Sequence, residues 1–172
     1  MVNFKNLIRD VPDFPIKGII FKDITTLIKD GKAFKKVIDK MAAHYRNKKI
    51  DRIVCVEARG FIIGSALAYK LGAGVVPVRK KGKLPAKKLT YKYKLEYGFD
   101  TIEIHEDAIE KGLNYLILDD LLATGGTSKA TYELLKKKKA KVVGFAFMVE
   151  LTFLKGRKKL PRGVDVFSLI KY

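Results

Sequence analysis

The chain has 172 residues, of which 48% are hydrophobic, and it carries 14 glycines. This is enough to bury a sizeable core, so we expect residues 1–172 to form a single globular domain. No apolar run approaches the ~20 residues of a membrane-spanning helix. The first ten residues have no signal-peptide core, so the expected location is cytoplasmic. Cys55 is the only cysteine, which excludes an internal disulfide, and its apolar neighbours predict a buried side chain.

The net charge is +18, from 36 Lys plus Arg against 18 Asp plus Glu. Such a field would concentrate polyanionic substrates and speed their capture. It could equally hold nucleic acid without sequence preference. Most of the lysines lie in helix or loop patterns without interleaved aromatic residues. We therefore interpret them as solvated faces and do not expect nucleic acid as the main partner.

The N-terminal residues 1–28 form the first predicted segment. A short helix is expected over residues 4–8. Residues 11–18 follow, and their prolines and glycine argue against regular structure. The apolar residues 19–21 could line a pocket.

The next elements alternate between helix and strand. An amphipathic helix is expected over residues 32–48, and a buried strand over 51–56. A helix over 60–71 and a strand over 74–78 follow. A strand, a helix and a strand within about 25 residues predict a right-handed parallel unit.

Residues 79–106 break this rhythm. Residues 79–85 are basic and turn-like, whereas residues 89–95 and 101–104 alternate apolar with polar side chains. This alternation predicts a two-stranded antiparallel excursion. An insertion of this kind in a parallel fold is where a flexible flap over an active site is expected.

The last part of the chain returns to the parallel pattern. Residues 115–118 read as a buried strand, and a helix is expected from about 128 to 138. Two further strands are expected over 141–149 and 164–169. The whole predicts an α/β fold, a mostly parallel twisted sheet flanked by helices, with ligand loops at the carboxyl ends of the strands.

The run 115–128, Tyr-Leu-Ile-Leu-Asp-Asp-Leu-Leu-Ala-Thr-Gly-Gly-Thr-Ser, carries the clearest functional signal. Gly125 and Gly126 allow a sharp bend and a close approach to a ligand, and the helix start that follows favours an anion. Asp119 and Asp120 would repel a phosphate, but they could accept hydrogen bonds from sugar hydroxyls or act through a cation. The acids could instead merely start a turn, and the glycines could cap a connection. The unbroken combination favours a ligand with a phosphate at one end of a ribose.

A second anion site is indicated by Glu57-Ala-Arg-Gly60, which follows a buried strand and opens a helix. Arg59 can grip two oxygens at once, and Gly60 permits close approach. The alternative is that Arg59 forms a structural ion pair with Glu57 or Asp51. Its place at the carboxyl end of a strand favours the ligand.

Four basic residues and one acid complete the candidates. Arg79 and Lys83 could reach a second phosphate group when the flap closes. For Lys80 and Lys81 the sequence does not decide between phosphate binding and a solvated position on the surface. Glu96, inside the predicted flap, could handle a proton on a base nitrogen if it came within hydrogen-bond reach.

Five segments in order resemble one enzyme family. The run 118–127 resembles the phosphoribosyl pyrophosphate (PRPP) motif of type I phosphoribosyltransferases. The resemblance narrows to the adenine phosphoribosyltransferases over segments 11–25, 57–61, 79–85 with 95–98, and 149–152. It covers nearly the whole chain. It implies a type I phosphoribosyltransferase fold in which an N-terminal hood (residues 1–28) binds the base and a flexible flap spans residues 79–106.

The resemblance also implies a reaction and partners. Adenine and PRPP would become AMP and pyrophosphate. Mg²⁺ would be held mainly by PRPP and pyrophosphate, with no direct side-chain ligand. The family usually forms homodimers, in which basic residues near the interface complete the partner's site.

Each candidate residue takes a role from the resemblance. Asp119 and Asp120 would face the ribose hydroxyls and the charge developing at the anomeric carbon. Glu96 would be the acid/base at adenine. The 5′-phosphate would be held by Ala123, Thr124, Gly125, Gly126 and Thr127, and the pyrophosphate by Arg59, Arg79 and Lys83. Adenine would lie between Phe21 and Leu151, with its edge read by the backbone of Ile20 and Lys22.

Two alternatives remain at this stage. A relative that uses a 6-oxopurine commonly needs a lysine near the base, and Lys22 is the only lysine in the proposed base-reading segment. A regulator that binds PRPP and nucleic acid usually carries an extra DNA-binding domain, for which we expect no room in this chain.

Overall fold

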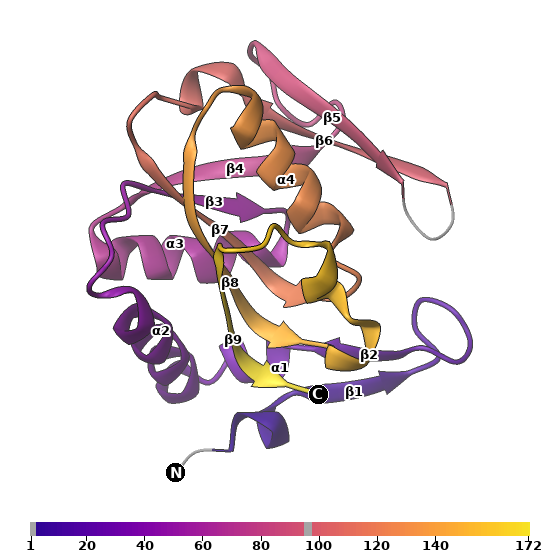
Figure 1. Ribbon diagram of the computed structural model, residues 1–172. Coiled ribbons are helices and arrows are strands. Elements are labelled where there is room, and N and C mark those ends of the chain that lie inside the picture. Colours follow the sequence, from indigo (N-terminus) through magenta and orange to yellow (C-terminus); the bar gives the residue numbers. More distant parts are fainter. Residues whose placement is uncertain (1–2, 95–97) are drawn as a thin grey trace.

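The computed structural model describes residues 3–94 and 98–172 (Figure 1). Its centre is a seven-stranded mixed sheet in the order β5-β6-β4-β3-β7-β8-β9. Strands β4, β3, β7, β8 and β9 are parallel, β6 runs antiparallel to β4, and β5 runs antiparallel to β6. The strands are β3 (Arg52–Val56), β4 (Gly74–Lys80), β5 (Lys88–Lys94), β6 (Phe99–His105), β7 (Asn114–Leu122), β8 (Lys141–Glu150) and β9 (Asp165–Lys171). The predicted fold class is confirmed, antiparallel excursion included.

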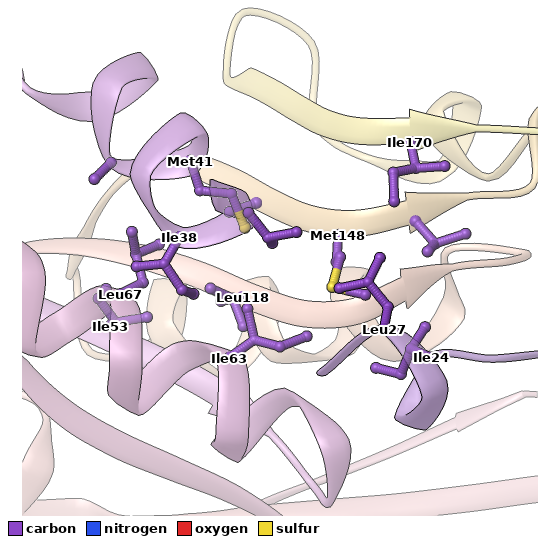
Figure 2. Packing of buried hydrophobic residues seen from close by; sticks show 14 of the residues in the cluster. Ile24, Leu27, Ile38, Met41, Ile53, Ile63, Leu67, Leu118, Met148 and Ile170 are labelled. Atoms are coloured by element: carbon purple, nitrogen blue, oxygen red, sulfur yellow. The ribbon is translucent and has the colours of Figure 1, made fainter. Parts of the chain in front are cut away.

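Alternate residues of the central strands face opposite sides of the sheet, and each side has its own core. One core packs under α1 (Thr25–Ile28), α2 (Gly31–Tyr45) and α3 (Arg59–Leu71). Figure 2 shows Leu118 of the sheet beside Ile63 of α3, and Met148 of the sheet beside Leu27 of α1. The other core packs under α4 (Gly126–Lys137) and contains the intervening strand residues, among them Val54, Ile117 and Phe145. Burial on both faces explains why the parallel strands are almost continuously apolar in sequence.

The N-terminal segment contains more regular structure than expected. After η1 (Phe4–Leu7), strand β1 (Arg9–Pro12) pairs antiparallel with β2 (Ile20–Asp23). The expectation that residues 11–18 lack regular structure is therefore wrong for Val11 and Pro12. Pro12 is compatible with the pairing because it ends an edge strand of a two-stranded sheet, where its missing N–H need not be a ladder donor.

Asp23 fixes the end of this hairpin to the first helix. Its carboxylate accepts from the hydroxyl of Thr25 over 2.7 Å, from the backbone N–H of Thr25 over 2.9 Å and from Arg9 Nε over 3.1 Å. The Thr25 hydroxyl, followed by Arg9, lowers the pKa of Asp23 to about 2. The carboxylate therefore stays ionised over the whole range in which the protein would normally work.

Several short elements were not predicted. They are α1 and the 3₁₀ turns η2 (Glu106–Ala108), η3 (Thr152–Leu154) and η4 (Gly156–Lys159). Each is too short for its periodicity to be visible in sequence. None of the helices in the described residues is long and apolar enough to cross a membrane.

Candidate active site

Asp119 and Asp120 lie inside β7 rather than after it. The strand extends beyond the predicted residues because Leu121 and Leu122 pair with Val149 and Glu150 of β8. Both acids are buried, with 9% and 7% of their surface exposed. The sheet therefore holds two adjacent carboxylates at the carboxyl end of β7, the middle one of its five parallel strands.

Burial changes the pKa values of the two carboxyl groups. It raises the pKa of Asp119 well above its ordinary range, and the neighbouring charge of Asp120 raises it further. Burial also raises the pKa of Asp120, against the opposing effect of the Arg59 guanidinium. Arg59 Nε lies 2.8 Å from Asp120 Oδ2, but no donor among the described residues points at that oxygen. The pair is thus an electron-rich, incompletely satisfied site that favours hydroxyl donors and positive charge.

The loop that follows has the geometry of an anion cradle. Gly125 has a backbone φ of 77°, a value that residues with a side chain rarely adopt. Helix α4 begins directly after it, two residues earlier than expected. The loop and the start of α4 enclose a cavity of about 70 Å³ lined by Asp119 and residues 121–128. The free N–H groups of the helix start and the Thr127 hydroxyl border this small cavity. Its place beside the acids suits a phosphate on a sugar.

The loop is packed tightly against the turn at Gly156. A Cβ on Gly125 would lie 2.5 Å from the Gly156 carbonyl oxygen. A Cβ on Gly156 would lie 2.1 Å from the Ala123 carbonyl oxygen. Two backbones approach here so closely that neither position has room for a side chain.

A second cavity of about 210 Å³ adjoins the acids. Across it, Arg79 Nε donates to Glu57 Oε2 over 2.8 Å, and Arg79 Nη1 donates to the Lys83 carbonyl over 3.1 Å. The Tyr93 hydroxyl reaches over from β5 and lies 3.0 Å from Thr127 Oγ1. The lining consists of Val56, Glu57, Val78, Arg79, Lys80, Tyr93, Asp100, Ile102, Asp119, Asp120 and Thr127. One cavity is therefore shared by the predicted acids, by Arg79 and by the end of the loop 123–127, which we call the phosphate loop.

Arg59 connects this cavity to the N-terminal hairpin. Its guanidinium carbon lies 4.8 Å from the centre of the Phe21 ring, while its Nε approaches Asp120. Neither partner considered from sequence is its partner here, because Glu57 binds Arg79 and Asp51 binds Asn114. Phe14 packs edge-on against the Phe21 ring at 5.1 Å.

The other base-binding candidates are placed as follows. Ile20 is exposed, and Leu151 is half-buried with its N–H bonded to the Leu122 carbonyl over 3.0 Å. The Lys22 ammonium lies 2.7 Å from Asp10 Oδ1 and 4.2 Å from the centre of the Tyr172 ring. This lysine is thus already engaged by an acid and an aromatic ring.

One candidate residue lies outside the described residues, and some residues of the site were not predicted. Glu96 falls within residues 95–97, which lie outside the described part of the chain. Lys83 has an exposed side chain. Sequence reasoning did not select Tyr93, although the alternation of residues 89–95 places it on the less exposed face of its strand. Gly156 and Arg157 carried no signal in sequence, because their importance comes from contacts with distant segments.

The chain is similar to known proteins over most or all of its length. Residues 25–170 match the family described as phosphoribosyl transferase domain. Adenine phosphoribosyltransferase of Geotalea uraniireducens is 58% identical over 172 residues, covering 100% of both chains. The structure of the Thermoanaerobacter pseudethanolicus enzyme of that name superposes with a TM-score of 0.95, at 54% identity and 98% coverage of both chains. The Saccharomyces cerevisiae enzyme, crystallised with adenine and an imino-altritol bisphosphate, gives a TM-score of 0.90 at 42% identity, with 96% of each chain covered.

The sheet topology, the buried acid pair and the adjoining phosphate loop define a phosphoribosyltransferase, and the family match agrees. The 58% sequence identity over the full length of the chain narrows the assignment to one family of these enzymes. The chain belongs to the adenine phosphoribosyltransferase family.

Proposed function

We propose that this protein transfers a phosphoribosyl group from PRPP to adenine, forming AMP and pyrophosphate in purine salvage. The observation that carries the proposal is the buried Asp119–Asp120 pair, which sits between the phosphate loop and the cavity bordered by Arg79. PRPP has a phosphate at one end, a ribose in the middle and a pyrophosphate at the other end. The order of these groups matches the order of loop, acids and basic side chain.

The acids would act mainly by electrostatics. Departure of pyrophosphate leaves positive charge on the anomeric carbon, and a carboxylate held in a poorly hydrated site stabilises such charge strongly. The raised pKa values of Asp119 and Asp120 reflect burial that is costly for the free protein. A cationic transition state would relieve that cost, so the pair favours the transition state over the unliganded site.

The chemistry of the site also fits the Mg²⁺ that such a reaction implies. Asp120 Oδ2 is a buried acceptor at which no described donor is aimed. It could bind a ribose hydroxyl or a water of a hydrated cation. Among the described residues no group of three or more potential side-chain ligands gathers for a metal. Mg²⁺, carried mainly by the substrate phosphates, would neutralise charge on the leaving pyrophosphate.

Adenine would bind against the N-terminal hairpin. Phe21 offers a ring beside Arg59, which in turn contacts Asp120, and Leu151 follows the strand next to β7. Both residues would therefore lie near the ribose. One edge of β2 has no strand neighbour in the two-stranded sheet, so backbone groups at Ile20 and Lys22 could read the base. The Lys22 side chain is held by Asp10 and Tyr172, which argues against its use on a 6-oxo group.

Three further proposals complete the account. Residues 1–28 act as a hood over the base, and residues 79–106 act as a flexible flap that closes on PRPP and contributes Arg79, Lys83 and Glu96. The protein works as a homodimer. Support for the dimer comes from apolar side chains that the single chain leaves open to solvent on α3 and β4, namely Ile62, Tyr69 and Val75.

Product analysis tests the proposed reaction. The protein is incubated with limiting PRPP, Mg²⁺ and an equimolar mixture of adenine, hypoxanthine and guanine. We expect AMP as the dominant nucleotide, with pyrophosphate formed in equal amount, and loss of both when a chelator removes Mg²⁺. IMP or GMP as the main product would overturn the assignment of the base, and no nucleotide at all would overturn the reaction.

A further inference from the structure

A partly buried ion pair outside the proposed catalytic set joins two parts of the site. Glu150 ends β8 and has only 4% of its surface exposed. Arg157 Nε donates to Glu150 Oε1 and Arg157 Nη2 to Glu150 Oε2, each over 2.7 Å. This is the planar two-point contact that an arginine makes best.

Two of the three remaining donors of Arg157 are used as well. Nη1 donates to the Val166 carbonyl over 2.8 Å, and Nη2 donates to the Ser168 hydroxyl over 3.1 Å. Burial works to raise the pKa of Glu150, but the hydrogen bonds from Arg157 and Ser168 outweigh it, and the pKa is lowered. Arg157 is thus fixed to the end of β8 and to the first half of the neighbouring strand β9.

One end of this network reaches the phosphate loop. Gly156 directly precedes Arg157, and a Cβ on it would lie 2.1 Å from the Ala123 carbonyl oxygen and 3.1 Å from the Gly125 nitrogen. A displacement of Gly156 must therefore displace the loop. The loop itself consists of small residues, and the Tyr93 hydroxyl contacts its far end at Thr127. The hydrogen bonds that hold Arg157 therefore also hold Gly156 against the phosphate loop.

The other end reaches the base pocket. Leu151 follows Glu150 directly, and its N–H bonds to the Leu122 carbonyl over 3.0 Å, immediately before the phosphate loop. The Glu150 carbonyl accepts from the Tyr172 N–H over 2.9 Å. The carboxylate that binds Arg157 is thus one residue away from the proposed adenine contact.

We propose that Glu150 and Arg157 are positioning residues that hold the phosphate loop, through Gly156, in the geometry that binds the 5′-phosphate. The inference rests on the proposed function, since it assigns the loop to the 5′-phosphate. It concerns residues that touch neither substrate. A shift of the loop by about 1 Å is enough to lower catalytic efficiency by a factor of about 100.

The test compares Arg157→Ala and Arg157→Lys with a matched control, Arg52→Ala. Arg52 also forms an ion pair, with Glu110 at 3.0 Å, and its side chain is 35% exposed against 38% for Arg157, although the Glu110 carboxylate is exposed and the Glu150 carboxylate is buried. It begins β3, at the end of the parallel strands away from the site. The lysine variant keeps the charge but loses the two-point contact, so it tests geometry rather than charge.

Two readouts are measured on folded protein. The first is KM for PRPP and kcat of AMP formation. The second is the affinity for ribose 5-phosphate by calorimetry, which requires no reaction. We expect Arg157→Ala to raise both KM and the dissociation constant at least about tenfold, with kcat changed by less than about threefold, and Arg157→Lys to lie between it and wild type. Arg52→Ala should lower thermal stability and leave both constants unchanged.

Three outcomes overturn the inference. They are wild-type constants in a folded Arg157→Lys or Arg157→Ala protein, an equal rise in Arg52→Ala, or a loss confined to kcat. If the wild type makes no AMP, the proposed function fails. The calorimetric comparison still decides, in that case, whether the pair positions the phosphate loop.

Discussion

Replacing Asp119 by Asn makes the protein more stable at neutral and alkaline pH. The buried carboxylate has a raised pKa, so the folded state holds its proton more tightly than the unfolded chain does. Between the unfolded value near 4 and the raised folded value, stability is lost as the pH rises. Asn has no proton to lose and keeps the Oδ1 that accepts from the Asp120 N–H at 2.9 Å. The expected gain at about pH 8 is roughly 1–3 kcal/mol, the usual cost of a poorly satisfied buried polar group.

Urea unfolding at about pH 5 and about pH 8 measures this effect, and the gain should be larger at the higher pH. Asp165→Asn provides a control of opposite sign. Although burial acts to raise the pKa of Asp165, hydrogen bonds from Lys48 and His44 lower it. Its ionised form therefore stabilises the fold above its unfolded pKa, and the variant should lose stability at both pH values. An Asp119→Asn protein that is less stable than wild type at about pH 8 would contradict the account.

Replacing Gly125 by Ala should disable the phosphate loop. A φ of 77° costs a non-glycine residue about 1–2 kcal/mol, and the Cβ would lie 2.5 Å from the Gly156 carbonyl oxygen, which cannot move without displacing that turn. We expect a loss of stability of at least about 2 kcal/mol and a fall in affinity for PRPP of about 100-fold. Thermal unfolding and calorimetry with PRPP measure the two effects.

The neighbouring glycine supplies the contrast. A Cβ on Gly126 would lie 3.6 Å from Tyr93 Cε2, an ordinary van der Waals contact, and the residue is helical. Gly126→Ala should therefore stay within about 1 kcal/mol of wild-type stability, since alanine favours a helix. If the two variants were equally unstable, the loop geometry described here would be wrong.

The sequence was sufficient to predict the central strands, which are continuously apolar, and the helices with a clear periodic pattern. Residues 53–56 and 116–118 are buried on both faces, and such runs have few alternatives in a chain with parallel connections. The two strands after β4 were found because their polar and apolar side chains alternate. β1 was missed because Pro12 argues against a strand, although an edge position tolerates it.

The site was predicted in part. Asp119, Asp120 and the loop after them lie in one continuous run, so local sequence placed them together. The partners of Arg59 depend on the packing of β7 and of the N-terminal hairpin, and no spacing in sequence reveals them. The same holds for Gly156 and Arg157, whose contacts lie in the phosphate loop and in β8.

The most direct test of the central claim is the rate of AMP formation from adenine and PRPP by wild type and by Asp119→Asn. We expect wild type to turn over. In the variant kcat should fall by about 100-fold or more, the size of effect expected when one preorganised electrostatic group is removed. This loss should occur in a protein that is folded and more stable than wild type at about pH 8. Turnover by the variant within a factor of about three of wild type would contradict the role given to the buried acid pair.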